Sequence, residues 1–148
     1  MKTSLKDQKV FKEFCNLEIN TNGISLYEIT DQVIKWIKSN KFNNGFINLS
    51  IQHTSASLIV QENADPDVQI DLIKHFNKLA PMDDQLYIHT TEGKDDMPAH
   101  IKASLTNNQI SLSIKNNVLL LGKWQGIYLF EHRINPQNRK IILHFFGD

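Results

Sequence analysis

The chain has 148 residues, which fits one domain and leaves little room for a second. Lys plus Arg and Asp plus Glu each number 16, so the formal net charge is zero. This balance argues against a nucleic-acid-binding protein, whose affinity depends on a basic excess, and against a polybasic membrane-binding surface.

A strand and a helix are predicted at the start of the chain. Apolar residues among polar neighbours indicate a strand over residues 8–20, followed by a turn at 21–23. Ser25 and Glu28 have the spacing of a capping box, in which the two side chains pair with backbone amides at a helix start. Apolar residues then recur at helical spacing to about Asn40, so a helix that begins at Ser25 is expected.

The middle of the chain predicts two strands and a second helix. Alternating apolar residues indicate a strand over 46–52, and a short apolar run indicates another over 57–61. Asp65 can accept hydrogen bonds from the first amides of a helix, and Pro66 stands where its missing N–H costs nothing. This helix is expected to end at Pro81.

A short helix opened by Met97 and Pro98 precedes a run of strands. The later strands are expected at residues 110–114, 118–124, 127–134 and 140–146. Polar turn residues separate the strands, which indicates antiparallel hairpins. Residues 1–148 are therefore expected to form one α+β domain, a mixed or antiparallel, sandwich-like sheet with two or three helices packed against it.

Cysteine content and hydropathy predict the compartment. Cys15 is the single cysteine, so an intramolecular disulfide is impossible, and a lone cysteine fits a reducing cytosol. Residues 1–7 lack the apolar run of a signal peptide, and no apolar stretch is long enough to span a bilayer. These features predict a cytoplasmic protein that binds neither nucleic acid nor membrane.

Three histidines lie in the polar middle of the sequence. Neutral imidazoles of His53, His89 and His100 could together bind a divalent metal and leave a position open for water or substrate. Asp96 precedes His100 by one helical turn, so their side chains face the same way. The spacing of the three histidines is long and irregular, and the alternative is that each makes an unrelated local hydrogen bond.

Carboxylates and one tryptophan segment add to the candidate site. Glu62 stands where a strand ends, and Glu92, Asp95 and Asp96 fall within five residues beside His100. Adjacent acids there could orient an imidazole or act as general acid or base, whereas a solvated acidic loop is the alternative. Gly126 indicates a close backbone approach that would direct Trp124 and Gln125 at a ligand, unless Trp124 packs in the core.

Four segments together carry a resemblance to a known family. They are Gln52–Ser57, Glu62–Val68, Glu92–Lys102 and Gly122–Arg133. Their order and approximate spacing resemble those of the YjbQ-like family, also called the secondary thiamine-phosphate synthase family. The resemblance covers nearly the whole chain, and the run Asp-Asp-Met-Pro-Ala-His-Ile-Lys that begins at Asp95 is its most specific part.

The resemblance implies a compact α+β homotrimer with its polar site near the subunit contacts. It implies a weak synthase activity that joins a thiazole phosphate and a pyrimidine pyrophosphate with loss of pyrophosphate, and a metal held by histidines. A three-histidine set favours zinc over magnesium. The residues expected to act in catalysis are Glu62, Glu92, Asp95, Asp96 and Gln125. Those expected to contact substrate are Thr54, Ser55, Asn63, Lys123, Trp124 and Arg133. The expected metal ligands are His53, His89 and His100.

Other functions compatible with the same residues remain open. A trimer could bind a small phosphorylated metabolite or a metal without turnover, or could hydrolyse phosphate esters with the help of a metal. Lys123 stands where the family usually has Thr, which exchanges a small hydroxyl for a long cation able to meet phosphate. Asn107 and Asn117 stand where the family usually has Gly, and Asn is the residue besides Gly that best tolerates positive φ.

Overall fold

The computed structural model of the chain describes residues 10–148. The first two residues of the predicted strand 8–20 and the N-terminal segment 1–7 lie outside that range. Within it, no helix combines the length and the apolar character needed to cross a membrane.

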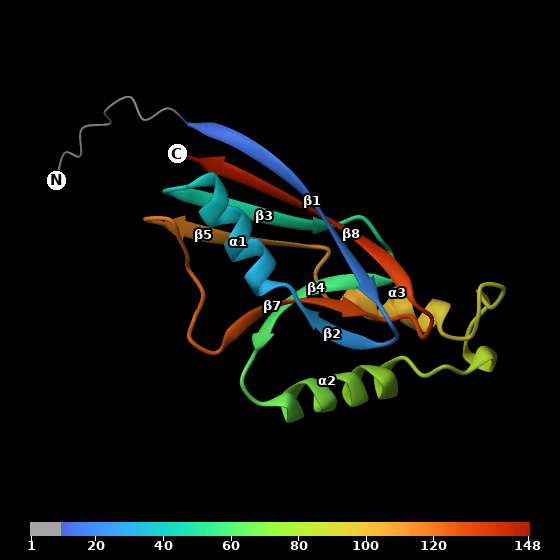
Figure 1. Cartoon of the computed structure of the whole chain (residues 1–148). Coiled ribbons are helices and arrows are strands. Elements are labelled where there is room, and N and C mark those ends of the chain that lie inside the picture. Colours follow the sequence, from blue (N-terminus) through green and yellow to red (C-terminus); the bar gives the residue numbers. More distant parts are fainter. Residues whose placement is uncertain (1–9) are drawn as a thin grey trace.

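The described part of the chain forms two sheets, of which the larger has five strands with every neighbouring pair antiparallel. In spatial order the strands are β1 (Phe11–Thr21), β8 (Gln137–Gly147), β3 (Gly45–Ile51), β5 (Gln109–Lys115) and β6 (Val118–Leu119). The long strands β1 and β8 pair along their whole length, from Phe11 opposite Gly147 to Thr21 opposite Gln137. They form the curved ribbon along the upper edge of the molecule in Figure 1.

The smaller sheet has three antiparallel strands with β7 (Gln125–Glu131) in the middle. Its edge strands are β2 (Ser25–Glu28) and β4 (Ala56–Glu62). Residues 126–131 of β7 are all buried, because the strand is paired on both sides and covered on both faces.

Among residues 10–148, three helices complete the α+β fold that the sequence predicts. They are α1 (Thr30–Asn40), α2 (Pro66–Leu79) and α3 (Asp96–Leu105), with a 3-10 turn, η1 (Asp84–Leu86), between the last two. α2 runs along the smaller sheet beside β2, and α3 packs against β4 (Figure 1). The main core lies between the sheets and α1, where Val33, Ile37, Ile47, Leu49 and Leu129 are at most 1% exposed.

The start of α2 follows its sequence signals, whereas the start of α1 does not. Asp65 accepts a hydrogen bond from the Asp67 amide at 2.9 Å, and Pro66 is the first helical residue. The capping box predicted at Ser25 is wrong: Ser25–Glu28 forms β2, and α1 begins only at Thr30. As an edge strand, Ser25–Glu28 satisfies the backbone groups on its β7 side, whereas the first amides of a helix have no partner within the helix.

The expected C-terminal hairpins are only partly present. β5 and β6 form a hairpin whose turn places Asn116 and Asn117 at φ of 53° and 61°, so Asn117 adopts the positive φ expected of it. β6 ends at Leu119, and residues 120–124 form a loop instead of continuing the strand. β7 and β8 lie in different sheets and do not pair, because the chain crosses between the sheets after β7.

The register of β4 and β7 determines where the candidate residues lie. Ala56 is opposite Glu131, and Glu62 is opposite Gln125. His53 to Ser55, just before β4, and His132 to Arg133, just after β7, therefore meet at one end of the pair. The segments 62–63 and 123–125 meet at the other end.

Candidate metal site and adjoining pocket

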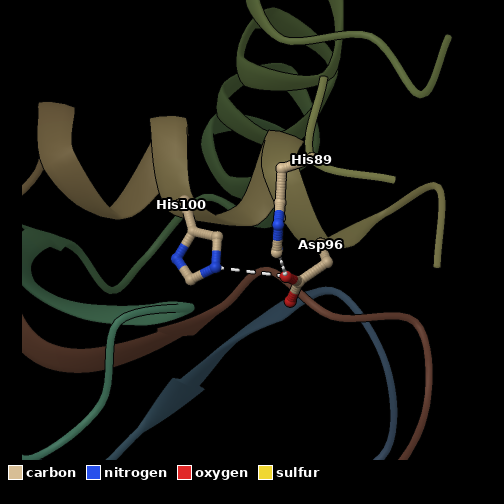
Figure 2. Close-up of side chains that lie close together, drawn as sticks. All are labelled: His89, Asp96 and His100. Carbon is tan, nitrogen blue, oxygen red and sulfur yellow. Dashed lines mark hydrogen bonds and ion pairs between the residues drawn. The ribbon is translucent and has the colours of Figure 1, made fainter. Parts of the chain in front are cut away.

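Two histidines and one aspartate converge at the start of α3. The Nε2 atoms of His89 and His100 lie 2.8 Å and 3.1 Å from the same carboxylate oxygen, Oδ2 of Asp96. His89 comes from the loop before α3, while Asp96 and His100 are one turn apart on the helix (Figure 2). Potential ligand atoms of the three residues all lie within 4.8 Å of one another.

A hydrogen bond from Nδ1 of His100 determines the protonation of the other ring nitrogen, Nε2, which faces Asp96. The Nδ1 atom of His100 is 3.0 Å from the carbonyl oxygen of Thr54, so Nδ1 must carry a proton and donate it. In the neutral ring, Nε2 is then unprotonated and faces a carboxylate oxygen. Two acceptors at 3.1 Å repel each other, and either a second proton on His100 or a shared cation relieves the repulsion. This arrangement fits a metal ligand set.

Arg133 holds the carboxylates in place from the opposite side. Its Nε donates to Oδ2 of Asp95 at 2.9 Å, its Nη1 donates to Oδ1 of Asp96, and its Nη2 donates to the carbonyl of Glu92 at 2.9 Å. A planar guanidinium suits this three-way contact, since its donors have fixed directions. Asp96 thus has one oxygen fixed by Arg133 and the other turned toward the two histidines.

Both aspartates are buried yet ionised. Burial raises the pKa of Asp95, but the Ile134 amide and Arg133 outweigh that effect and leave it below its ordinary value. Burial likewise raises the pKa of Asp96, and hydrogen bonding from His89 and the charge of Arg133 bring it below the ordinary value. The site therefore presents a stable negative charge beside two imidazoles.

A second buried ion pair fixes the strand end that carries Arg133. The carboxylate of Glu131 is fully buried and accepts from Nη2 of Arg139 at 2.6 Å and from Nε at 2.7 Å. It also accepts from the Thr21 hydroxyl and from the backbone amides of His132 and Arg133. With its lone pairs satisfied in this way, Glu131 determines the direction in which the chain leaves β7.

A pocket of about 270 Å³ adjoins the three-residue cluster and shares His100 with it. It is lined by His53, Thr54, Ala56, His100, Ala103, Ser104 and Asn108. The lining contains imidazole, hydroxyl and amide groups and two alanines, and no carboxylate. A small polar ligand beside the cluster would occupy this space.

The predicted site residues at this end have distinct positions. His53 does not join the cluster of His89, Asp96 and His100, because its Nε2 accepts a hydrogen bond from the Lys140 amide at 2.8 Å. The Ser55 hydroxyl is buried and accepts from Arg139 at 3.1 Å. Glu92 contributes its backbone carbonyl to Arg133, and its side chain is exposed.

The other predicted residues form a separate group at the far end of β4 and β7, called here the opposite-end cluster. Its members are Glu62, Asn63, Lys123, Trp124 and Gln125. The Asn63 amide donates to the Trp124 carbonyl at 3.1 Å, and Oε1 of Gln125 accepts from the Gly122 amide at 2.7 Å. Trp124 is 57% exposed, so it is not a core residue, and the Lys123 ammonium lies 4.6 Å from the centre of its ring. β4 is seven residues long, which separates the two ends by about 20 Å.

Sequence reasoning missed a polar group buried behind the cluster. Nε2 of His132 is 2.9 Å from the Ser57 hydroxyl, and Nζ of Lys102 donates to Asn77 at 2.6 Å. Burial, with Lys102 and Arg139 nearby, lowers the pKa of His132 to about 3. Strand alternation cannot reveal these residues, because Lys102 lies on α3 and His132 follows β7, whose residues 126–131 are buried on both faces. The spacing of Asp96 and His100 was the signal that did identify a true neighbour pair.

The fold and the order of these segments match one family. The chain belongs to the YjbQ-like family, whose model, described as "UPF0047 protein YjbQ-like", matches residues 15–148. Among its relatives, UPF0047 protein sll1880 of Synechocystis is 45% identical over 132 residues, which covers 89% of this chain and 90% of that protein. UPF0047 protein YjbQ of Escherichia coli O157:H7 is 37% identical over 139 residues, covering 93% and 99%.

Solved structures of related proteins have the same fold. An uncharacterised YjbQ/UPF0047-family protein of Clostridium acetobutylicum is 32% identical, with a TM-score of 0.81 over 88% of this chain and 98% of that one. A protein of unknown function from Sulfolobus solfataricus is 20% identical, with a TM-score of 0.86 over 94% and 99%. At that identity, the second similarity concerns the fold alone.

Proposed function

We propose that this protein is a divalent-metal-dependent enzyme that acts on a small phosphorylated metabolite. The reaction is of the synthase type implied by the family resemblance, in which a thiazole phosphate and a pyrimidine pyrophosphate are joined and pyrophosphate leaves. His89, Asp96 and His100 would hold the metal, and the pocket beside His100 would hold the substrate.

One observation carries this proposal. Asp96 turns a single carboxylate oxygen toward two imidazole nitrogens, at 2.8 Å and 3.1 Å, while Arg133 fixes its other oxygen. The His100 nitrogen that faces Asp96, Nε2, carries a lone pair and no proton in the neutral ring, since Nδ1 donates to the Thr54 carbonyl. A buried carboxylate with two converging imidazoles is a ligand set for a cation, and Arg133 and the Thr54 carbonyl already orient two of its members.

The donor set favours zinc or a neighbouring transition metal over magnesium. Two imidazole nitrogens and one carboxylate oxygen suit zinc, and three protein ligands leave a position for water or substrate. When bound, such a metal would supply a positive charge that offsets the charge of a phosphate group. The chain itself fixes Asp96 through Arg133 and orients His100 through Thr54.

Elemental analysis tests the metal assignment directly. Purified wild-type protein is expected to hold about one transition-metal ion per subunit, whereas His89→Ala and His100→Ala lose most of it. His75→Ala is the control, because His75 is exposed on α2 outside the cluster. A wild-type protein that takes up no metal from excess zinc would refute the proposal.

An activity assay separates the possible functions. Release of pyrophosphate from the thiazole and pyrimidine substrates supports the synthase reaction, provided that His100→Ala abolishes it. Tight binding of a phosphorylated metabolite without product supports a binding protein instead. Phosphate release from generic esters supports a phosphoesterase.

Within one chain the opposite-end cluster is too far from the proposed site to take part in it, so it can contribute only if it belongs to another subunit. Trp124 and Lys123 lie about 20 Å from the His100 end of the same chain, and Trp124 is largely exposed. We propose a homotrimer in which this end of one subunit meets the His100 end of the next, as a head-to-tail contact closes a ring. Light scattering gives the oligomeric state. Mixing inactive His100→Ala and Trp124→Ala subunits should restore part of the activity, and no recovery would contradict a shared site.

A further inference from the structure

His53 differs from the other two histidines of the site in what its ring nitrogens contact. Nε2 lies 2.8 Å from the backbone nitrogen of Lys140, at the end of β3 where β8 runs alongside. The Lys140 amide always donates, so Nε2 must accept and cannot carry a proton. The same lone pair cannot also bind a metal.

The remaining nitrogen of His53 must therefore carry the ring proton. With Nε2 as the acceptor, the neutral ring is the Nδ1–H tautomer. Burial lowers the pKa of His53, and the Arg139 and Lys140 charges lower it further against the opposing charge of Glu131, which agrees with the neutral ring that the Lys140 contact requires. Nδ1 makes no hydrogen bond to any residue from 10 to 148, which leaves one fixed donor without a partner.

The unpaired donor belongs to a residue that lines the pocket beside the metal cluster. His53 shares this pocket with His100, and the Thr54 carbonyl joins the two by accepting from His100. The pocket lining has no carboxylate, and Lys140 is close enough to lower the His53 pKa, whereas the charge of Arg139 is paired with that of Glu131. A negatively charged ligand oxygen suits such surroundings better than a cation does.

We propose that His53 contacts the substrate rather than the metal, and that its Nδ1–H donates a hydrogen bond to a phosphoryl oxygen bound in the pocket beside His100. This inference rests on the proposed function for its metal and deepens it by assigning the group that recognises phosphate. It also divides the three histidines into two that hold a cation and one that orients the anion.

Two substitutions separate the two nitrogens of His53. In His53→Gln, the side-chain oxygen reaches the position of Nε2 and still accepts from the Lys140 amide, but no donor remains at the Nδ1 position. In His53→Asn, the shorter amide places an N–H near the Nδ1 position and loses the Lys140 contact. The first variant removes the proposed hydrogen-bond donor to phosphate, and the second removes the hydrogen bond from the Lys140 amide.

Inorganic phosphate is the probe, titrated calorimetrically into the zinc-loaded full-length protein and also without added zinc. His53→Gln is expected to keep the metal content and thermal midpoint of the wild type and to bind phosphate about ten- to hundredfold more weakly. His53→Asn should lose thermal stability but keep phosphate affinity within about threefold. Loss of metal by His53→Gln would overturn the inference, because His53 would then be a ligand. Unchanged phosphate affinity in His53→Gln, or no phosphate binding by the wild type, would also overturn it.

Nitrogen NMR of the wild-type imidazoles gives a readout independent of metal and activity. The His53 ring should show a protonated Nδ1 and an unprotonated Nε2, and the opposite tautomer would refute the inference even if the variants fail to fold. Failure of the wild type to bind metal would refute the proposed function alone, since the tautomer and the metal-free phosphate titration still decide the assignment of His53.

Discussion

The Nε2 atom of His100 lies 3.1 Å from Oδ2 of Asp96, one helical turn earlier, while the Nδ1 atom of the same ring is committed to the Thr54 carbonyl at 3.0 Å. The carbonyl therefore determines the tautomer that His100 offers to the aspartate. A backbone group on the loop before β4 thus controls the chemistry of a side chain on α3. The proximity of α3 to β4 makes this coupling possible.

Removing the charge of Asp96 is expected to abolish metal binding. Asp96→Asn keeps the size of the side chain but loses the anion that faces His89 and His100, so metal content measured by mass spectrometry should fall at least tenfold. Glu92→Gln is the matched control, because that acid lies in the same segment with an exposed side chain. Equal metal content in Asp96→Asn and the wild type would rule out Asp96 as a ligand.

Arg133 is expected to stabilise the site rather than bind substrate. Arg133→Gln leaves the buried carboxylates of Asp95 and Asp96 without their counter-ion, which should lower the free energy of unfolding by about 3 kcal/mol. Arg133→Lys should recover little of this, since an ammonium cannot match the three-way contact of a guanidinium. Urea denaturation measures the effect. A loss below about 0.5 kcal/mol in both variants would contradict it.

The buried Glu131–Arg139 ion pair is expected to contribute separately to the free energy of unfolding. Glu131→Gln leaves the Arg139 charge buried and unpaired, and we expect a loss of about 3–5 kcal/mol. The exposed Lys74–Asp71 pair on α2 provides the comparison: Asp71→Asn should change stability by less than about 0.5 kcal/mol. Chemical denaturation of both variants under the same conditions tests the difference that burial makes.

His132 should make the fold sensitive to acid. Burial lowers its pKa to about 3 from an ordinary value of 6.5, so between these pH values the unfolded chain binds a proton that the folded chain does not. Its contribution to stability is complete above about pH 6.5 and declines as the pH falls toward 3, by at most about 1.4 kcal/mol per pH unit.

Thermal melts across this range test the sign. His132→Gln, which does not titrate and can still reach the Ser57 hydroxyl, should flatten the decline between pH 6.5 and pH 4. His75→Gln, on the exposed face of α2, should leave the slope unchanged. A slope that is the same in His132→Gln and the wild type would exclude His132 as its source.

The strands and helices with a strong local signal were predictable from the sequence. Residues 46–52 alternate, and Ile47, Leu49 and Ile51 are buried as a strand requires. Asp65 and Pro66 start α2 because capping depends on neighbours in the sequence. Ser25 and Glu28 carry an equally good local signal, yet they form β2, since the segment pairs with β7 as an edge strand of the smaller sheet. Long-range pairing of this kind is invisible to local spacing.

For the site, the sequence by itself determined the residue types and one short-range relationship. The α+β class, the family segments and the placement of Asp96 one turn before His100 follow from composition, order and helical period. Only the tertiary structure decided which of these residues meet, because antiparallel β4 and β7 place His53 and Arg133 at one end and Lys123 and Trp124 at the other. It also separated His53 from His89 and His100, since the partner that occupies its Nε2 is a backbone amide 87 residues away in the sequence. Such a partner is determined by sheet register, which depends on the packing of the whole chain.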